Sequence, residues 1–315
     1  MRLKYLKMKK NSKIYIAGHN GMVGSAILRK LKEKGFTSLI YKSSSDLDLT
    51  NQNKVISFFE KNKPEYVFLA AAKVGGIEAN NVYKAQFIYE NLMIQSNIIH
   101  SSYLFNVKKL LFLGSSCIYP KLSQQPILED YLLSGKLEPT NKPYAIAKIA
   151  GVEMCKSYNI QYKTNFISLM PTNLYGTNDN YHPNDSHVFA SLIRKCLVAK
   201  KNGYKNISLW GSGKPLREFL HVNDLASAAL FLMQNYNENK IINVGSGDEI
   251  SIKDLALKIL KYLDFDCSIV FDKTKPDGTP RKLLDSSKIK KLGWKPKISI
   301  NKGIKMTIEE NLKVF

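Results

Sequence analysis

The feature that most constrains the fold is a short apolar strand that runs into a glycine-rich turn and then a helix. Residues 13–18 read KIYIAG, and residues 21–35, GMVGSAILRKLKEKG, place apolar residues at the helical period. The glycines at 18, 21 and 24 let the backbone turn tightly and let a diphosphate approach the positive end of the helix. This context predicts a dinucleotide site; the alternative is a purely structural turn.

The first half of the chain continues the alternation of apolar strands and amphipathic helices, which is typical of a parallel sheet wrapped by helices on both faces. After Pro171 the rhythm breaks, and residues 176–216 read as loop-rich. We therefore expect an α/β fold, a Rossmann-type doubly wound parallel sheet with a smaller α/β substrate-binding domain at the C-terminal side. The expected strands are 13–18, 38–42, 65–72, 108–116, 165–171 and 241–246; the expected helices are 21–35, about 51–61, 83–104 and one starting near Pro143.

The two expected domains interleave along the chain. Residues 13–175 together with about 217–247 form the dinucleotide-binding domain, and about 176–216 together with 248–315 form the substrate domain. Residues 1–12 read as a flexible basic leader.

The composition of the chain limits which partners we expect it to bind. The net charge of +21 would suit an anionic ligand, but no aromatic-basic stripe accompanies it, so we expect no nucleic acid. The four cysteines fit no metal or disulfide pattern, so we expect no metal and a reducing, cytoplasmic setting. There is no signal-peptide core and no run of about 18 apolar residues, so we expect no membrane association.

The end of the second expected strand bears on the choice of cofactor. An acidic residue there would bind the ribose 2′-hydroxyl of NAD. The chain instead has Lys42 followed by three serines, with no acid until Asp46. A lysine and hydroxyl groups suit a 2′-phosphate, which predicts NADP(H).

A tyrosine and a lysine four residues apart, Tyr144 and Lys148, face the same way at the start of an expected helix. The same spacing recurs at Tyr5/Lys9 and Tyr236/Lys240. Only Tyr144 follows a glycine-rich nucleotide turn and a strand that ends at Ser115. This order predicts a serine–tyrosine–lysine set for carbonyl reduction.

These motifs resemble the extended short-chain dehydrogenase/reductases and, among them, the GDP-L-fucose synthase family. Matching runs occur in order over most of the chain. They include AGHNGMVGSAI, AAAKVGGIEANN, LGSSCIYPK, EPTNKPYAIAKIAG, MPTNLYG, LWGSGKPLREFLHVNDLA and KPDGTPRKLLD. The resemblance implies a bifunctional enzyme that uses NADPH to convert GDP-4-keto-6-deoxy-D-mannose into GDP-L-fucose by 3,5-epimerisation and 4-reduction.

The resemblance also assigns the two chemistries to residues. A ketone at C4 acidifies the hydrogens at C3 and C5, and a cysteine and a histidine, matching Cys117 and His187, then move protons at these carbons. His182, in the same loop, is a weaker candidate for this role. For the reduction, Tyr144 protonates O4, Ser115 binds the carbonyl oxygen and Lys148 supports Tyr144.

The remaining contacts follow from the same match. Two departures from the family affect them: Asn20 stands where an arginine is common in the cofactor turn, and Lys195 stands where a second arginine is common, which loses the bidentate fork. The expected cofactor-binding residues are Gly18, His19, Asn20, Gly21, Met22, Val23, Gly24, Lys42, Leu113, Gly114, Ser115, Ser116, Lys148, Pro171, Thr172, Asn173, Leu174 and His187. The expected substrate-binding residues are Lys195, Trp210, Arg217, Asp277 and Lys282, with Arg281 as an alternative to Lys282.

Two alternatives remain open at this level. The same chemistry could act on a related GDP-4-keto-6-deoxy sugar, such as a heptose for capsule or lipopolysaccharide. A regulatory protein that only senses NADP would be expected to lose part of the Ser115, Tyr144 and Lys148 set, which is complete here. The resemblance further implies a homodimer built on the long helices near 83–104 and 143–160.

Overall fold

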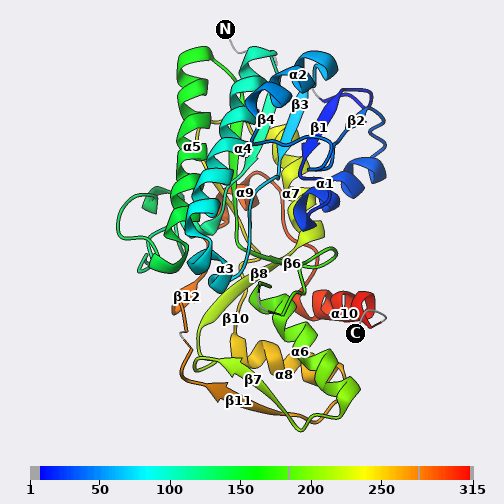
Figure 1. Ribbon diagram of the computed structural model, residues 1–315, viewed down its shortest axis with the longest axis vertical. Helices are drawn as coiled ribbons and strands as arrows, with labels where there is room; N and C mark the ends of the chain where they lie inside the picture. Colours follow the sequence, from blue (N-terminus) through cyan, green and yellow to red (C-terminus); the bar gives the residue numbers. More distant parts are fainter. Residues whose placement is uncertain (1–7, 184, 276, 313–315) are drawn as a thin grey trace.

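The computed structural model describes residues 8–183, 185–275 and 277–312. The chain forms an upper lobe around a six-stranded sheet and a smaller lower lobe, with the N-terminal end at the top and the C-terminal end beside the lower lobe (Figure 1).

The upper lobe is built on a parallel sheet with strand order β2-β1-β3-β4-β5-β9. Its central strands are buried along their whole length because helices cover both faces. All six expected strands occur, each somewhat shorter than the sequence pattern suggested. They are β1 (Ile14–Ala17), β2 (Leu39–Ile40), β3 (Tyr66–Leu69), β4 (Lys109–Leu113), β5 (Phe166–Pro171) and β9 (Ile242–Val244).

Two helix layers enclose this sheet. Helices α1 (Met22–Glu33) and α7 (Val222–Asn235) pack on one face, and α2 (Gln52–Asn62), α4 (Lys84–Leu104) and α5 (Lys142–Tyr162) pack on the other. The remaining elements of this lobe are short: α3 (Ile77–Val82), α9 (Ser287–Lys291) and the 3-10 turns η1 (Ser116–Ile118), η2 (Glu129–Tyr131) and η3 (Pro139–Asn141). The expected doubly wound fold is confirmed.

The lower lobe combines two small sheets with three helices, which enclose a hydrophobic core of their own. One sheet has the order β10-β8-β12, with β6 also paired to β8, and the other joins β11 to β7. The elements are β6 (Asn173–Tyr175), α6 (Val188–Asn202), β7 (Asn206–Trp210), β8 (Leu216–His221), β10 (Glu249–Ser251), α8 (Ile252–Tyr262), β11 (Ser268–Asp272), β12 (Arg281–Lys282) and α10 (Ile300–Asn311).

Three details differ from the sequence-based expectations. Residues 176–216 contain a helix that was not expected there: α6 occupies 15 of them, with its buried side chains at helical spacing, and Gly203 ends it. The expected domain limits at 175 and 217 fall inside the sheet formed by β6 and β8 rather than between the lobes. Of the expected leader, residues 1–7 lie outside the described residues, whereas Met8 is buried in the core of the upper lobe.

In the described part of the chain, no helix combines the length and the apolar character that a membrane crossing requires.

Candidate active site

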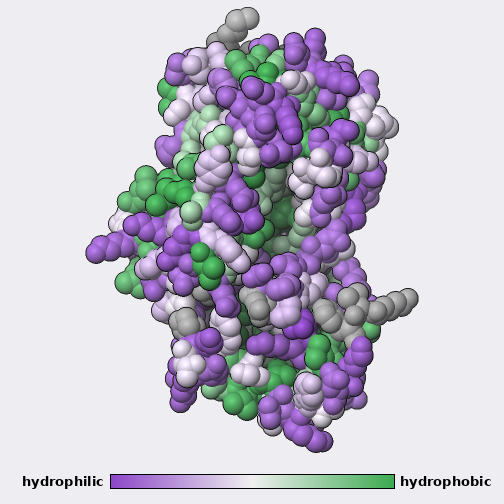
Figure 2. All heavy atoms as spheres, in the orientation of Figure 1, coloured by the Kyte–Doolittle hydropathy of each residue, from purple (hydrophilic) through white to green (hydrophobic). Residues whose placement is uncertain are grey.

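A cleft of about 1120 Å³ lies at the carboxyl ends of the upper-lobe strands and reaches the lower lobe. Figure 2 shows the surface hollowed between the lobes, with apolar residues in the hollow. Every residue named above as a catalytic, cofactor or substrate contact lines this cleft, although those residues span positions 18 to 282 of the chain. His182 and Arg281, the two alternatives, are not among its lining residues.

The glycine turn at one end of the cleft is closed on itself. The Gly21 N–H donates to the Gly18 carbonyl at 3.1 Å, and Gly18 has a φ of +85°, which favours glycine. A Cβ on Gly24 would lie 2.0 Å from the Gly18 carbonyl oxygen, so the first turn of α1 can approach the loop only as glycine. The buried Nδ1 of His19 has no hydrogen-bond partner, so it is available to a bound group. A closed turn at a helix N-terminus with an unpaired polar atom fits a dinucleotide.

The end of β2 supplies the charge near this turn. Lys42 lines the cleft, and the His19 ring lies 4.8 Å from the Tyr41 ring. The Ser43 hydroxyl donates to Asp46 at 2.7 Å, and this hydrogen bond lowers the pKa of Asp46, as do the nearby Lys42 and His19 more weakly. The carboxylate that the sequence places beyond the strand therefore lies near the lysine expected to bind a 2′-phosphate.

The serine–tyrosine–lysine set comes together where β4 meets α5. Ser115 caps η1 by accepting from the Cys117 N–H at 3.1 Å. Burial and the nearby Cys117 raise the pKa of Tyr144, while a hydrogen bond with Ser115 opposes them, so the phenol is protonated at neutral pH. The Lys148 Nζ donates to the Leu113 carbonyl at 2.8 Å and lies 5.8 Å from the centre of the Tyr144 ring. Burial lowers the pKa of Lys148 to about 7.

Cys117 has a cationic neighbour from a distant part of the chain. The Lys282 Nζ, on β12, donates to the Cys117 Sγ at 3.5 Å. His187 is the residue at the N-cap position of α6, where its side chain makes no capping hydrogen bond and is exposed in the cleft. Desolvation by the surrounding walls lowers its pKa, with a smaller contribution from Lys282. Lys282, expected only as a substrate contact, therefore lies against Cys117 and within electrostatic reach of His187.

The other expected substrate contacts lie on the lower lobe. Trp210 is 41% exposed, with the Lys275 Nζ 5.2 Å from its ring centre. The Lys195 Nζ donates to the Ser208 carbonyl at 2.8 Å. Desolvation lowers the pKa of Arg217, and nearby acidic groups and the Cys117 thiol partly offset it. These cationic and aromatic side chains suit an anionic nucleotide.

Asp277 is engaged within the protein. Its Oδ1 accepts from the Ser212 N–H at 2.6 Å and its Oδ2 accepts from the Ser212 hydroxyl at 2.8 Å. It therefore closes the loop after β7 while lining the cleft.

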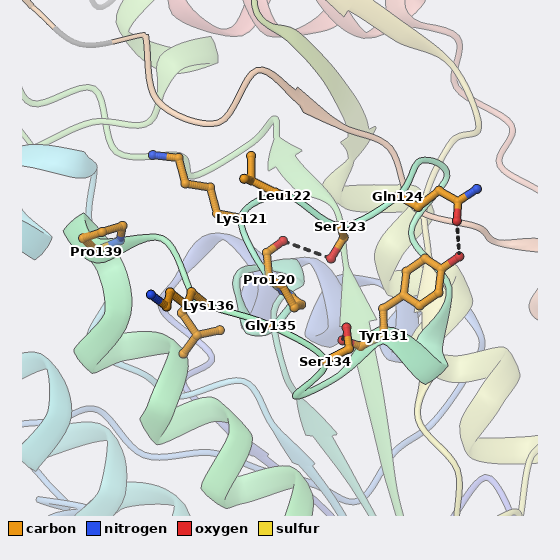
Figure 3. Close-up of a pocket in the computed structure, with 11 residues that line it drawn as sticks. Pro120, Lys121, Leu122, Ser123, Gln124, Tyr131, Ser134, Gly135, Lys136 and Pro139 are labelled. Atoms are coloured by element: carbon orange, nitrogen blue, oxygen red, sulfur yellow. Dashed lines mark hydrogen bonds between the residues drawn. The ribbon is translucent and has the colours of Figure 1, made fainter.

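A second, smaller pocket of about 570 Å³ lies in the segment between residues 120 and 139 (Figure 3). It shares Lys121 with the large cleft, where the Lys121 Nζ lies 2.8 Å from a Glu138 carboxylate oxygen. Among the described residues, no group of three or more His, Cys, Asp or Glu is placed to hold a metal ion.

The doubly wound sheet, the closed glycine turn and the Ser115, Tyr144 and Lys148 set define a short-chain dehydrogenase/reductase type of protein. The NAD dependent epimerase/dehydratase family matches residues 14–245, and the chain belongs to this family.

Within the family, the chain is similar to GDP-L-fucose synthases. It is 58% identical to putative GDP-L-fucose synthase 2 of Arabidopsis thaliana, over 96% of this chain and 92% of that protein. It is 50% identical to GDP-L-fucose synthase of Escherichia coli K12, over 94% and 95%. Among solved structures, a GDP-mannoheptose C4 reductase from Campylobacter jejuni with NADP bound is 43% identical, covers 96% of this chain and 99% of its own, and has a TM-score of 0.88.

Proposed function

We propose that this chain is a GDP-L-fucose synthase, an NADPH-dependent 3,5-epimerase and 4-reductase that converts GDP-4-keto-6-deoxy-D-mannose into GDP-L-fucose. The observation that carries the proposal is that two different groups of polar side chains line one cleft. One group is Ser115, Tyr144 and Lys148, and the other is Cys117, Lys282 and His187. A reductase alone needs only the first set. The identity of 50% or more with GDP-L-fucose synthases over nearly the full chain supports the same substrate.

The cofactor assignment rests on the glycine turn, on Lys42 and on the relative that binds NADP. The backbone of Gly18–Gly24 holds the diphosphate, and Lys42 binds the 2′-phosphate. NADPH supplies the hydride for C4 when it is bound.

The chemistry of the sugar follows from the side chains. The C4 ketone acidifies the hydrogens at C3 and C5, and Cys117 and His187 exchange protons at these carbons. The Lys282 Nζ lies 3.5 Å from the Cys117 Sγ, so a cation stands beside the group that exchanges the proton. Because burial raises its pKa, Tyr144 retains its proton and can give it to O4, while Ser115 binds the same oxygen and Lys148 holds Tyr144 and the nicotinamide ribose.

On the lower lobe, Arg217 and Lys195 bind the diphosphate of the GDP-sugar, and Trp210 packs on the substrate. Asp277 lines the same end of the cleft.

The proposal is tested by product analysis. The chain is incubated with NADPH and either GDP-4-keto-6-deoxy-D-mannose or a corresponding GDP-4-keto-6-deoxy-heptose, and the products are identified by mass spectrometry and NMR. We expect GDP-L-fucose from the hexose, with a higher kcat/KM than for the heptose. The reverse preference would favour the second candidate, which is suggested by the 43% identity with a mannoheptose reductase.

A variant separates the two chemistries. Cys117→Ser keeps the size of the side chain but replaces the thiol by a far less acidic hydroxyl, so exchange at C3 and C5 should fall by about 10²–10⁴. Reduction of the unepimerised ketone should continue and give a D-manno product, GDP-D-rhamnose. Deuterium uptake from D2O and product stereochemistry report the two steps. An inverted sugar formed at nearly the wild-type rate would show that Cys117 serves only packing.

We also propose that the chain is cytoplasmic and forms a homodimer through α4 and α5. Both helices carry exposed apolar side chains, including Tyr89 at 61% and Ile160 at 65%. Light scattering should therefore give twice the mass of the chain, and Ile160→Glu should reduce it to one.

A further inference from the structure

Lys282 contacts Cys117 from strand β12, which is too short to hold its position by strand pairing alone. Strand β12 contains only two residues and pairs in parallel with β8, where Arg281 lies opposite Leu216 and Lys282 lies opposite Arg217. Paired residues point to the same face, so Lys282 and Arg217 both reach the cleft. A slip of one residue would turn Lys282 to the other face and remove its Nζ from the thiol.

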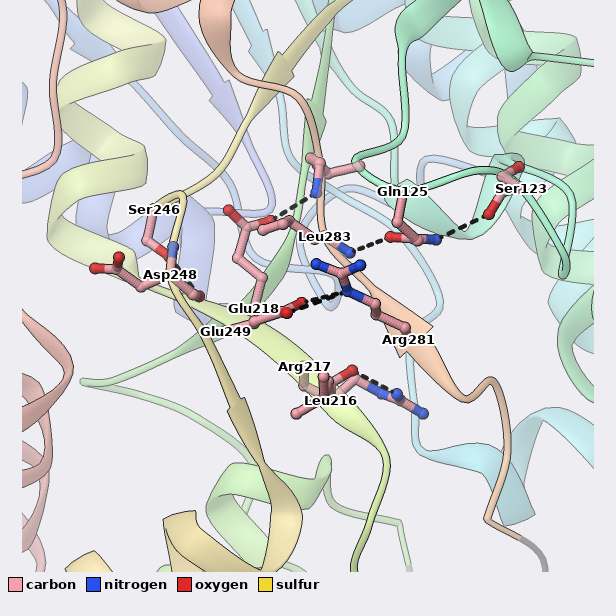
Figure 4. Close-up of polar contacts among 11 residues, drawn as sticks. Ser123, Gln125, Leu216, Arg217, Glu218, Ser246, Asp248, Glu249, Arg281 and Leu283 are labelled. Atoms are coloured by element: carbon pink, nitrogen blue, oxygen red, sulfur yellow. Dashed lines mark hydrogen bonds and ion pairs between the residues drawn. The ribbon is translucent and has the colours of Figure 1, made fainter.

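Glu218 lies on the opposite face of β8, directly behind this pair. Its side chain leaves the strand in a different direction from that of Arg217 (Figure 4), and its exposed fraction is 0%. Its Oε2 accepts from the Leu284 N–H at 3.1 Å, two residues after Lys282, and its Oε1 accepts from the Gly247 N–H at 2.7 Å. One carboxylate therefore fixes both the segment after β12 and the segment after β9.

The surroundings of Glu218 are built for this arrangement. A Cβ on Gly245 would lie 2.2 Å from Oε1, so any other residue there would displace the carboxylate from this position. The Glu218 carbonyl oxygen accepts from Thr172 Oγ1 at 3.2 Å and from Asn173 Nδ2 at 2.9 Å, two residues of the cofactor side of the cleft. The residue thus joins the cofactor side and the Cys117 side.

Gln125 holds the same segment from the other side. Its Oε1 accepts from the Leu283 N–H at 2.8 Å, and the Ile127 N–H donates to the Leu283 carbonyl at 2.8 Å (Figure 4 shows the Gln125 contact). Leu283 and Leu284 are thus each held by a side-chain acceptor.

We propose that Glu218 is a positioning residue for proton transfer: by binding the Leu284 N–H it sets the register of β12, and this register holds Lys282 against the Cys117 thiol. A carboxylate is required because it accepts two N–H groups at once. An amide has one accepting oxygen, so in Glu218→Gln either Gly247 or Leu284 faces an NH₂ group instead of an acceptor. The inference rests on the proposed function, in which Cys117 exchanges a proton with the sugar.

The test measures thiolate reactivity in the full-length chain without substrate or cofactor. Iodoacetamide modification of Cys117 is followed at neutral pH by peptide mass spectrometry; the other three cysteines, Cys155, Cys196 and Cys267, are at most 9% exposed. Because the Lys282 Nζ contacts the Cys117 Sγ, its positive charge is next to the sulfur that attacks the reagent. Lys282→Met should therefore slow modification about ten-fold, and Lys282→Arg should largely restore it.

Glu218→Gln should slow modification several-fold, and the double variant with Lys282→Met should be no slower than Lys282→Met alone, because Glu218 acts through Lys282. Glu309→Gln is the control. It removes an exposed carboxylate of α10, which pairs with Lys305 and does not contact β12, and should leave the rate within about two-fold.

An unchanged rate in a folded Glu218→Gln variant, or additive effects in the double variant, would overturn the inference. If Glu218→Gln does not fold, the rate of Cys117 modification is measured in Gln125→Leu, which releases the Leu283 N–H of the same segment. An unchanged rate in that variant also overturns the inference. Modification of Cys117 does not depend on the identity of the sugar. Lys282-dependent reactivity in a chain that makes no GDP-L-fucose would therefore reject the proposed function and leave this inference standing.

Discussion

Gly24→Ala should open the nucleotide turn, and its cost can be worked from the contacts. The added Cβ would lie 2.0 Å from the Gly18 oxygen, 2.5 Å from the Gly18 carbonyl carbon and 2.9 Å from the His19 Cα, all backbone atoms that cannot rotate away. Overpacking costs about 1–3 kcal/mol, and such short contacts belong at the upper end. Alanine regains about 1 kcal/mol of helix propensity, so the net loss in unfolding free energy is about 2 kcal/mol.

The assay has two readouts. Thermal unfolding of the ligand-free chain should show a Tm lower by roughly 4 °C, and titration of NADPH fluorescence should show a Kd at least about ten-fold higher. Gly21→Ala is the control for stability, because a Cβ there meets only the Gly18 oxygen, at an ordinary 3.6 Å. A Gly24→Ala variant with the stability and NADPH affinity of the wild type would refute the reasoning that this turn is closed by steric contact.

Three further predictions concern the charged and titrating groups. Tyr144→Phe should lower the rate of reduction by about 10²–10⁴ while deuterium still enters the sugar from D2O, and loss of exchange as well would contradict the separate roles. Lys42→Ala should raise the Kd for NADPH about ten-fold and leave that for NADH nearly unchanged, as calorimetry would show; equal losses would point to a structural role. Burial lowers the pKa of Lys148 from its ordinary value of 10.5 to about 7 in the folded chain. Between these two pH values the unfolded chain binds a proton at Lys148 that the folded chain does not, so the free energy of unfolding rises with pH. Lys148→Met should flatten that rise in urea unfolding, and an unchanged slope would show that Lys148 keeps its charge in the fold.

The sequence predicts what local patterns determine. The central strands are apolar runs and α1 follows a glycine turn, so the upper lobe and its cofactor end are readable from period and spacing. The buried residues of helix α6, Phe189, Leu192, Ile193 and Cys196, also follow the helical period, but a long polar loop precedes them and the sequence has no clear signal for where the helix begins.

The lower-lobe sheet is a different case, because pairing between β8 and β12 joins residues about 65 positions apart and leaves no local pattern. The contact between Lys282 and Cys117 depends on that pairing, so the sequence indicated both residues without indicating that they meet.

The mixed order of the lower-lobe sheet also affects how the protein is made. Its strands come from residues 173–175, 216–221, 249–251 and 281–282, whereas the last strand of the upper sheet ends at Val244. A growing chain therefore has every upper-lobe strand before the ribosome has produced β12. The part of the cleft around the glycine turn can begin to assemble during synthesis, whereas the part around Cys117 and Lys282 forms only after residues near the C-terminus have been made. A chain truncated after α8 would retain the parts for binding a dinucleotide and lack the lysine next to Cys117.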